Sequence, residues 1–288
     1  MSQADLSIII VSFNVKAYLL KCLNSIFKQS GKSLFEVIVV DNASIDASAE
    51  AVKNEFPQVV LVANLQNKGF AKANNQGIKI TCGRNILLLN PDTKIIDNSL
   101  EKMANYLDQN KNIGICGPIL LNPDRSVQNM GYMFPTLFSL FNSKLIKTKS
   151  RNPYEVDWVQ GAGLMFKSSL LKTVGYFDEK YFMYGEEKDF CFRVKKEGWK
   201  VVVLPSCSLI HYSSQSTKGR EASAFVEYHR SQAYFLRKHY SRWFSFMARW
   251  FFYLGALKNH VIASFFTGDK WRQKRAVFSS VLKWYSNS

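Results

Sequence analysis

The feature that most constrains this chain is an alternation of continuous apolar runs with amphipathic segments through its first third. The apolar runs are residues 6–14, 35–44, 59–67 and 85–95, and the amphipathic segments between them are residues 15–29, 46–56 and 69–81. Runs of Ile, Val and Leu without polar alternation are typical of strands buried on both faces of a largely parallel sheet. The pattern therefore predicts the α/β class, with a mixed, mostly parallel sheet flanked by helices.

The rest of the chain is less regular. Helices are expected at residues 98–107 and 185–199, strands at residues 113–121 and 200–212, and an irregular, proline-interrupted region at residues 122–155. From about Thr217 the sequence changes to basic segments rich in aromatic residues and helical in character. We therefore expect an α/β domain of residues 1–216 and a C-terminal helical segment of residues 217–288.

The cysteines and the N-terminus bear on the cellular compartment. The five cysteines are odd in number and show no CxxC spacing. This usage argues against a disulfide framework or a structural zinc site, and it favours a reducing compartment. The first apolar run, Leu6–Val11, is too short for a secretion signal and passes directly into polar residues. We expect a cytoplasmic protein.

Positive charge is concentrated in the C-terminal segment. The net charge of the chain is +16, and residues 217–288 contain thirteen Lys and Arg against three Asp and Glu. The same residues include four of the six tryptophans. A basic, aromatic segment suits either nucleic acid or an anionic membrane surface as a partner.

Polar residues, in one case with a glycine, lie at the end of each of the four apolar runs. They are Ser12 and Asn14, Asp41 and Asn42, Asn67 and Gly69, and Asn90 and Asp92. A single polar end would be an ordinary turn. Ligands of open parallel sheets bind beyond the carboxyl ends of the strands, however, and four polar ends in succession favour a site there. The first turn lacks the glycines of a dinucleotide fold, and residues 30–33 lack the first glycine of a P-loop.

Seven segments, spread roughly from Leu6 to Ser216, carry a family resemblance. They are SIIIVSFN, VIVVDNASID, NKGFAKANNQGI, LLLNPDT, QGAGLMFK, GYFDEKYFMYGEEKDFCFR and HYSSQS. Each is weak alone, but their number, order and spacing together resemble the family-2 glycosyltransferases, which have the Rossmann-like GT-A fold. They are most similar to the rhamnosyltransferase-like branch of cell-surface polysaccharide synthesis.

This resemblance implies a reaction. The enzyme would be an inverting glycosyltransferase that moves rhamnose or a similar hexose from a dTDP- or UDP-sugar. The acceptor would be a saccharide or a polyprenyl-diphosphate-linked saccharide. The displacement would occur in a single step, without a covalent intermediate on the protein.

The resemblance also implies a divalent metal site. The family has a short acidic motif, usually Asp-x-Asp, after the fourth strand, and here it reads Asn90-Pro91-Asp92, so only the second acid is retained. Asp92 would hold Mg²⁺ or Mn²⁺ against the donor diphosphate. His211 resembles a later family histidine that can supply a second ligand, and imidazole would favour Mn²⁺. A plain turn and a packed histidine are the alternatives on the residues alone.

The implied nucleotide-sugar site draws on several segments. Its residues would be Ser12, Asn14, Asp41, Asn42, Asn67, Gly69, Asn75 and Asn90, with Trp158, Gly161 and Ala162 lining the donor and acceptor sides. The Asp41 carboxylate can accept the imide N–H of a uracil or thymine ring. Small residues at 161–163 let the backbone approach a sugar closely. Asn75 could equally be a solvated helix residue.

Three acids lie at the start of the helix expected at residues 185–199, namely Glu186, Glu187 and Asp189. Acids in a first helical turn also complement the helix dipole, which is the structural alternative. In the family, the second acid of a pair deprotonates the acceptor hydroxyl, and by position this is Glu187. Many relatives have Asp there, so Glu186 stays open as the base.

Two other functions must be weighed against this resemblance. A nucleotidyltransferase that modifies nucleotide sugars usually has a glycine-rich, basic phosphate loop after its first strand, and this chain lacks one. A non-catalytic nucleic-acid-binding protein would suit the charge. It conflicts, however, with acids where a phosphate groove needs lysines. We therefore expect no nucleic-acid partner.

The C-terminal segment is expected to bind a membrane without crossing it. Its uncharged apolar run from Trp250 to Leu257 is far shorter than the roughly 20 apolar residues of a spanning helix. Basic residues with interfacial aromatics suit an amphipathic helix on an anionic surface, which predicts a peripheral position on the inner face of the cell membrane. Alternatively, these aromatics cover the core of the α/β domain.

Overall fold

The computed structural model describes residues 4–29, 35–129, 131–136, 150–213, 215 and 219–287. These residues form two compact units. Within the described ranges, the first unit contains residues 4–134, 150–180 and 186–215, and the second contains residues 135–136, Tyr181–Gly185 and residues 219–287. The candidate site residues all belong to the first unit.

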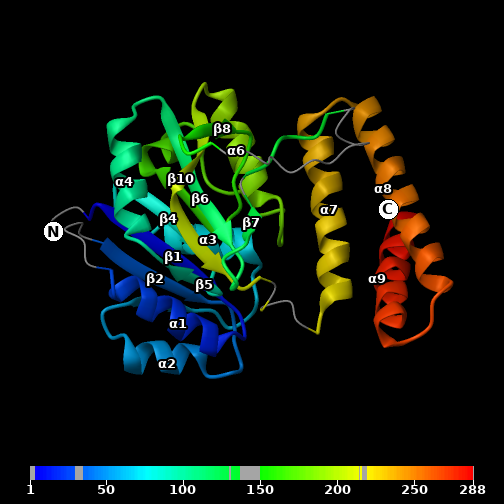
Figure 1. Ribbon diagram of the computed structural model, residues 1–288, viewed down its shortest axis with the longest axis horizontal. Coiled ribbons are helices and arrows are strands. Elements are labelled where there is room, and N and C mark those ends of the chain that lie inside the picture. Colours follow the sequence, from blue (N-terminus) through cyan, green and yellow to red (C-terminus); the bar gives the residue numbers. More distant parts are fainter. Residues whose placement is uncertain are drawn as a thin grey trace. The chain divides into compact units, whose positions relative to one another are not determined.

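A mixed sheet forms the centre of the first unit (Figure 1). Its strands are β1 (Leu6–Ser12), β2 (Phe35–Asp41), β3 (Val60–Ala63), β4 (Asn85–Leu89), β5 (Thr93–Ile95), β6 (Ile113–Leu121), β7 (Val127–Asn129), β8 (Tyr154–Val156), β9 (Gly163–Lys167) and β10 (Lys200–His211). They are ordered β3-β2-β1-β4-β9-β6-β10-β5, with β7 beside β6 and β8 beside β10. The expected α/β class with a mixed sheet is confirmed.

Strand direction changes halfway across the sheet. The strands β3, β2, β1 and β4 are parallel, as their continuous apolar runs predict. The strand β9 runs antiparallel to both β4 and β6. The strand β10 is parallel to β6, and its last residues pair antiparallel with β5. This last pairing brings the C-terminal end of β10 beside the turn that follows β4.

Helices flank the sheet on both faces. They are α1 (Lys16–Phe27), α2 (Ser48–Glu55), α3 (Phe70–Ile78), α4 (Ser99–Gln109) and α6 (Glu186–Lys196), with a short 3₁₀ helix, η1 (Ser168–Lys172). Several predicted elements are shorter than expected: the apolar run at 59–67 forms a strand only over Val60–Ala63, and the helix expected at 69–81 ends at Ile78. The run at 85–95 is divided into the two strands β4 and β5.

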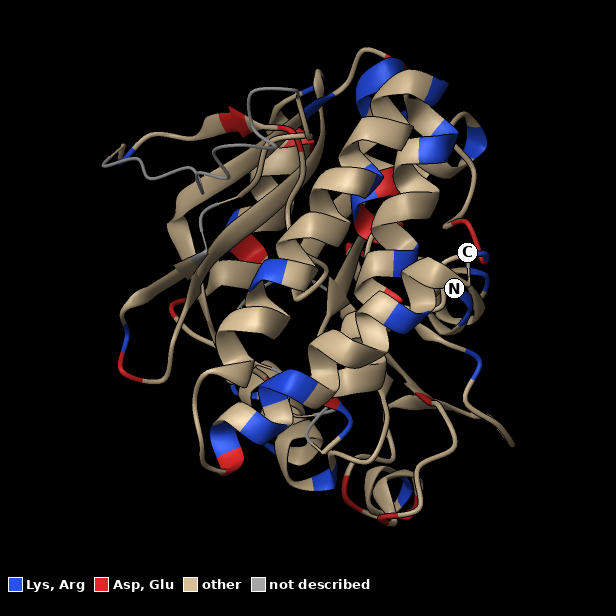
Figure 2. Ribbon diagram, turned by 90° about the vertical axis from the view of Figure 1, so that its right-hand side faces the viewer, with Lys and Arg blue, Asp and Glu red and all other residues tan. Residues whose placement is uncertain are grey.

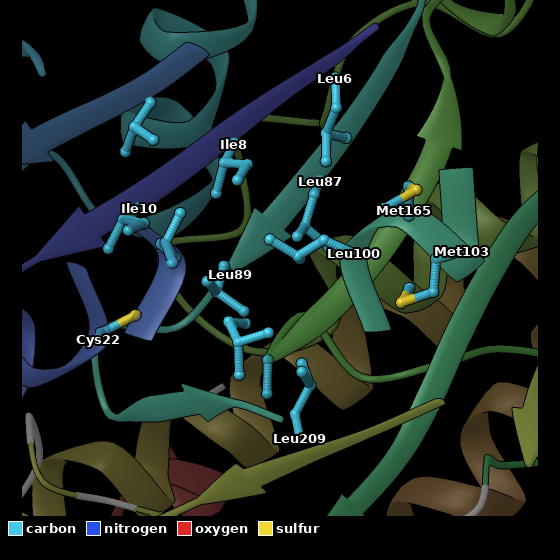
Figure 3. Packing of buried hydrophobic residues seen from close by; sticks show 14 of the residues in the cluster. Leu6, Ile8, Ile10, Cys22, Leu87, Leu89, Leu100, Met103, Met165 and Leu209 are labelled. Carbon is cyan, nitrogen blue, oxygen red and sulfur yellow. The ribbon is translucent and has the colours of Figure 1, made fainter. Parts of the chain in front are cut away.

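Alternation along the strands divides the core into two layers. Leu6, Ile8 and Ile10 of β1 face the layer that α1, α2 and α4 cover, where Leu100 and Met103 pack against Leu87, Leu89 and Met165 (Figure 3). Ile9 faces the other layer, where a Cβ on Gly77 of α3 would lie only 2.7 Å from its Cγ2. Burying each such aliphatic side chain stabilises the fold by about 1.5–3 kcal/mol, and the two layers hold the strand ends in register.

The second unit is built from three long helices, α7 (Glu221–His239), α8 (Arg242–Ser264) and α9 (Asp269–Ser286). Ser241 caps α8, because its hydroxyl accepts a hydrogen bond from the Phe244 amide at 3.2 Å. Leu236, Phe244 and Ala248 form a buried cluster between α7 and α8. Among the described residues, no helix has the length and the apolar character that crossing a membrane requires.

Candidate active site

Ser12 and Asp41 end the neighbouring strands β1 and β2 and lie opposite each other in register. Both are buried. One Asp41 oxygen, Oδ2, accepts the Ser44 amide at 3.0 Å, but Oδ1 and the Ser12 hydroxyl have no partner within the described part of the chain. A buried polar atom without a partner costs about 1–3 kcal/mol. This pair therefore marks a position where a ligand would complete the hydrogen bonding.

Asn42, Asn67 and Gly69 form a network that shapes the loop before α3. The Asn42 amide donates to Asn67 Oδ1 at 2.8 Å and to the Gly69 carbonyl at 3.2 Å, and its own oxygen accepts the Lys68 amide at 3.0 Å. Gly69 has φ +82° and ψ 170°, a conformation that essentially requires glycine. The structure thus uses both asparagine side chains to hold this loop at the edge of the sheet.

Asn14 connects the ends of β1 and β2. Its side-chain oxygen accepts a hydrogen bond from the backbone amide of Ile45 at 2.7 Å. Its backbone amide donates to the Ser44 hydroxyl at 2.9 Å. It has a φ of +54°, which asparagine tolerates better than most residues. Asn14 therefore fixes the loop that follows Asp41 at the end of β2.

Asn75 is not placed with this group. It is 2% exposed, and its amide donates to the Phe177 carbonyl at 2.9 Å and to Glu179 at 3.0 Å. Its oxygen accepts the Phe177 amide at 3.0 Å. Because every side-chain polar atom is engaged, the structure assigns Asn75 to the support of the 177–179 loop.

Asp92 and His211 lie beside each other in the turn after β4 and at the end of β10. His211 Nε2 is 3.4 Å from Asp92 Oδ1 and 3.4 Å from the Asn90 amide nitrogen. His211 Nδ1 lies 2.7 Å from Gln128 Oε1, which can only accept, so the network assigns the ring proton to Nδ1. The Nε2 lone pair then faces Asp92, the arrangement expected of a metal-binding histidine with an outer hydrogen-bond partner.

The donor set fits a divalent cation that also binds the substrate. No group of three or more His, Cys, Asp and Glu side chains suited to a metal occurs within the described ranges. One carboxylate and one imidazole leave most coordination positions to phosphate oxygens and water, which suits Mg²⁺ or Mn²⁺ in a substrate complex. Asp92 and His211 therefore form the two-residue candidate site for such a cation.

Glu186 and Glu187 begin α6 as a buried pair of acids, 3% and 8% exposed. Burial, and next the negative charge of Glu187, raises the pKa of Glu186 well above its ordinary value. Burial therefore disfavours the charged form of Glu186. A Cβ on Gly161 would lie 4.0 Å from the Glu187 Cβ, so the small-residue segment expected to line the site does lie beside this acid.

Asp189 has a structural partner. Its carboxylate forms an ion pair with Arg193 at 2.8 Å, one helical turn later, and it is fully buried. Arg193 also donates to the carbonyls of Val174 and Tyr176. Asp189 thus ties α6 to the 174–176 segment, whereas Glu186 and Glu187 lie in the preceding half-turn.

Trp158 and Lys188 form an aromatic and cationic group. The Trp158 ring stacks on Tyr132 at 4.1 Å between centroids, and Lys188 Nζ lies 5.9 Å from the Trp158 centroid. Burial lowers the pKa of Lys188 to about 8, against the opposing attraction of Glu187. Ala162 lies four residues after Trp158 in the chain. Its carbonyl accepts a hydrogen bond from the backbone amide of Asn90 at 3.5 Å, and this bond links the segment to the turn that carries Asp92.

Sequence reasoning missed Gln128, Tyr132 and Lys188 as site residues. Lys188 lies inside the acidic motif, so its position alone could have drawn attention. Gln128 and Tyr132 come from the proline-interrupted region, where no periodicity or motif marks them. They are brought to the site by β7 pairing with β6 and by the bridge between Tyr132 and Trp158.

Comparison with known proteins identifies the family. The family model "Glycosyl transferase family 2" matches residues 7–174, more than half of the chain. The chain belongs to glycosyl transferase family 2. The matched residues include β1 to β4, Asp41, Asp92 and the Trp158–Ala162 segment, and the acidic pair of α6 follows them.

Two of the curated relatives that the chain matches are named as rhamnosyltransferases. The chain is 28% identical over 240 residues to the N-acetylglucosaminyl-diphospho-decaprenol L-rhamnosyltransferase of Mycobacterium tuberculosis, covering 74% of this chain and 78% of the relative. It is 25% identical over 215 residues to the dTDP-rhamnosyl transferase RfbF of Shigella flexneri, covering 73% and 69%. These matches confirm the rhamnosyltransferase-like resemblance.

Solved structures confirm the GT-A fold of this family 2 member. One is GalNAc-T7 with UDP, GalNAc and Mn²⁺, with a TM-score of 0.63 at 15% identity, covering 100% of this chain and 56% of that one. Another is the mannosyltransferase PcManGT of Pyrobaculum calidifontis with GDP-Man and Mn²⁺, with a TM-score of 0.60 at 14% identity, covering 100% and 87%. The protein is a glycosyltransferase, and the nucleotidyltransferase and nucleic-acid-binding alternatives are not favoured.

Proposed function

We propose that this glycosyltransferase moves rhamnose or a similar hexose from a dTDP- or UDP-linked donor to a lipid-linked saccharide, with inversion and with a divalent cation. The observation that carries the proposal is the Asp92–His211 pair, in which a carboxylate oxygen and a ring nitrogen lie 3.4 Å apart beyond β4. The names of the two curated relatives support the sugar and the lipid-linked acceptor.

Asp92 and His211 would hold the cation, and Gln128 would keep His211 in the required tautomer. The bound cation would neutralise the negative charge that develops on the departing diphosphate. Because imidazole is one of two protein ligands, the pair favours Mn²⁺ over Mg²⁺. Asn90 Nδ2, 3.4 Å from His211 Nε2, could donate to the Nε2 lone pair only while no cation is bound there.

Ser12 and Asp41 would bind the base of the donor. The free Asp41 Oδ1 can accept the imide N–H of uracil or thymine, and the Ser12 hydroxyl can donate to or accept from the same ring. Cytosine and the purines do not offer that N–H in the same position. Asn14, Asn42 and Asn67 would act by holding the loops that frame this position.

Glu187 would be the general base. Burial disfavours the charged form of Glu186, whereas Glu187 is the more exposed of the two and would accept the proton of an acceptor hydroxyl. As that oxygen bonds to the anomeric carbon, the bond from this carbon to the phosphate oxygen breaks and the nucleoside diphosphate leaves. Gly161 and Trp158 would lie along the acceptor beside Glu187.

Calorimetric titration with UDP, dTDP, CDP and ADP, each with and without Mn²⁺, tests the donor site. The proposal predicts tight binding of UDP or dTDP only, and dependence on the cation. A transfer assay with dTDP-rhamnose, UDP-hexoses and an N-acetylglucosaminyl-diphospho-lipid then tests the reaction, with the product anomer assigned by NMR. Cation-independent binding of ADP with no discrimination among bases would contradict the proposed donor site.

A further inference from the structure

One side of α8 exposes a continuous apolar row. The row consists of Trp243, Met247, Trp250, Leu254, Leu257 and Val261, whose exposed fractions lie between 36% and 61%. The spacing alternates between four and three residues, which keeps all six on one side of a helix. Phe265, 80% exposed, extends the same side just beyond the last helical residue. We call these six residues the α8 row.

The α8 row is not needed for packing inside the second unit. The buried residues of α8 are Phe244, Ser245, Ala248, Ala256 and Ala263, which lie between the members of the row in sequence. Phe244 and Ala248 pack with Leu236 of α7. An aromatic and aliphatic surface of this extent, left exposed by its own domain, is typical of an interaction site.

The charges around the row indicate the kind of partner. The helices α8 and α9 together contain eight Lys and Arg against the single acid Asp269, and α8 contains no acid. In Figure 2 the helices that face the viewer carry blue segments repeatedly along their length. A second copy packed along α8 would add the positive charges of a second α8, and α8 contains no acid to balance them. Anionic headgroups supply the missing negative charge.

We propose that the α8 row docks the protein on an anionic phospholipid bilayer, with α8 lying along the surface. The apolar side chains would enter the boundary between headgroups and acyl chains, where Trp is favoured, and the basic side chains of α8 and α9 would bind headgroups. The row extends along a helix of 23 residues, about 35 Å, which suits a surface orientation. This inference rests on the proposed function only in linking the surface to a lipid-linked acceptor.

Sedimentation of the full chain with vesicles tests the docking. Vesicles of mixed phosphatidylglycerol and phosphatidylcholine should pellet the protein at low salt, and phosphatidylcholine alone should pellet much less. The triple variant W243S/W250S/L254S should bind the mixed vesicles at least about 100-fold more weakly, because three apolar side chains no longer leave water. A matched variant, V60S/I80S/Y176S, alters exposed apolar residues of the first unit (46%, 48% and 44% exposed) and should bind like the parent.

Fluorescence locates the contact on α8 itself. Lipids brominated near the headgroup quench tryptophans that enter the interface. The variant W243F/W250F keeps the row apolar, so it should still pellet with vesicles but should lose most of this quenching. Trp199 lies in the first unit, and W199F should leave the quenching unchanged. Undiminished quenching in W243F/W250F would place the contact elsewhere and overturn the proposal.

Two further measurements separate this proposal from its competitors. If the row instead joins two copies, sedimentation equilibrium would show a dimer that W243S/W250S/L254S converts to a monomer, with unchanged vesicle binding; that result would overturn the proposal. Titration of UDP or dTDP with Mn²⁺ reports the donor site alone and should be the same for the triple variant and the parent. A failure of docking and a failure of the proposed donor site are therefore distinguishable.

Discussion

The Asp92 carboxylate and the His211 imidazole lie 3.4 Å apart, Oδ1 to Nε2, although they come from distant parts of the chain. They meet because His211 pairs with Thr93 where the end of β10 runs antiparallel to β5. Both side chains are buried, and each has a supporting contact, the Gln215 amide for Asp92 and Gln128 for His211. The pairing of β10 with β5 therefore holds the two side chains beside each other.

Replacing Asp92 by Asn tests the cation site. The amide preserves the shape of the side chain but removes the charge and one strong oxygen ligand. We expect Mn²⁺-dependent binding of UDP or dTDP to weaken more than about 100-fold. Loss of a residue that only hydrogen-bonds to a metal ligand already lowers metal affinity by about 10–100-fold, and loss of the ligand itself should lower it further. Calorimetry measures the affinity, and circular dichroism checks the fold. Parent-like activity of the variant in EDTA would rule out the cation role of Asp92.

Gln128 is expected to tune metal affinity through His211. The substitution Gln128→Leu removes the acceptor for the Nδ1–H, and Mn²⁺ affinity in the presence of nucleotide should fall by about 10–100-fold. The substitution Gln128→Glu restores an acceptor and should recover most of the affinity. Electron paramagnetic resonance of Mn²⁺ measures both without a turnover assay. Equal affinities for the Leu variant and the parent would show that Gln128 only packs against His211.

The two acids of α6 are expected to differ in their effect on rate. Glu187→Gln should lower kcat by about 10²–10⁴, the usual contribution of a general base, with little change in donor affinity. Glu186→Gln replaces the more deeply buried carboxyl, whose charged form burial disfavours, so its effect should be much smaller. Single-turnover transfer assays distinguish chemistry from product release. The reverse order of effects would make Glu186 the base.

His229 should make the stability of the helical unit depend on pH. It contacts the Tyr285 hydroxyl at 3.1 Å, and burial lowers its pKa from 6.5 to about 4. Between pH 6.5 and pH 4 the histidine is protonated in the unfolded state but not in the folded state. The contribution of His229 to the free energy of unfolding is therefore fully present above pH 6.5 and is lost as the pH falls toward 4. The loss should be about 2 kcal/mol at pH 5 and about 3 kcal/mol in all.

Urea unfolding at pH 7 and pH 5, followed by tryptophan fluorescence, measures this pH dependence. The variant His229→Gln retains a polar side chain but does not titrate, so the difference between the two pH values should shrink by about 2 kcal/mol. Carboxylates that titrate elsewhere contribute equally to both proteins and cancel in the comparison. An identical pH difference in parent and variant would contradict a role for His229.

The side-by-side position of Ser12 and Asp41, the residues proposed to bind the donor, could be predicted from sequence because both residues follow local rules. Ser12 and Asp41 end apolar runs, and parallel strands bring their carboxyl ends to the same edge. Gln128 could not be predicted in this way. It lies in a region without periodicity, and its contact with His211 depends on how β7 and β10 both pair with β6. Such pairing is set by the whole sheet, not by neighbours in sequence.

Asp189 and Asn75 show a different limit. The sequence placed Asp189 with two other acids at a helix start, yet its ion pair with Arg193 follows the i,i+4 rule and could have been read from the same residues. Asn75 looked like a polar residue on a helix beside the donor loop. Its contacts with Phe177 and Glu179 join residues far apart in sequence, and only the tertiary structure reveals them.

The antiparallel pairing of β5 with the end of β10 also determines when the cation site can form during synthesis. Asp92 emerges from the ribosome long before His211, and β1 to β4 can associate through contacts made entirely within the first ninety residues or so. The two ligands meet only after β10 has been translated and has docked. A nascent chain that stops short of Leu209 therefore contains the ends of β1 and β2, which we propose bind the nucleotide, but not the Asp92–His211 pair, so the proposed cation site would form only after β10 has been made.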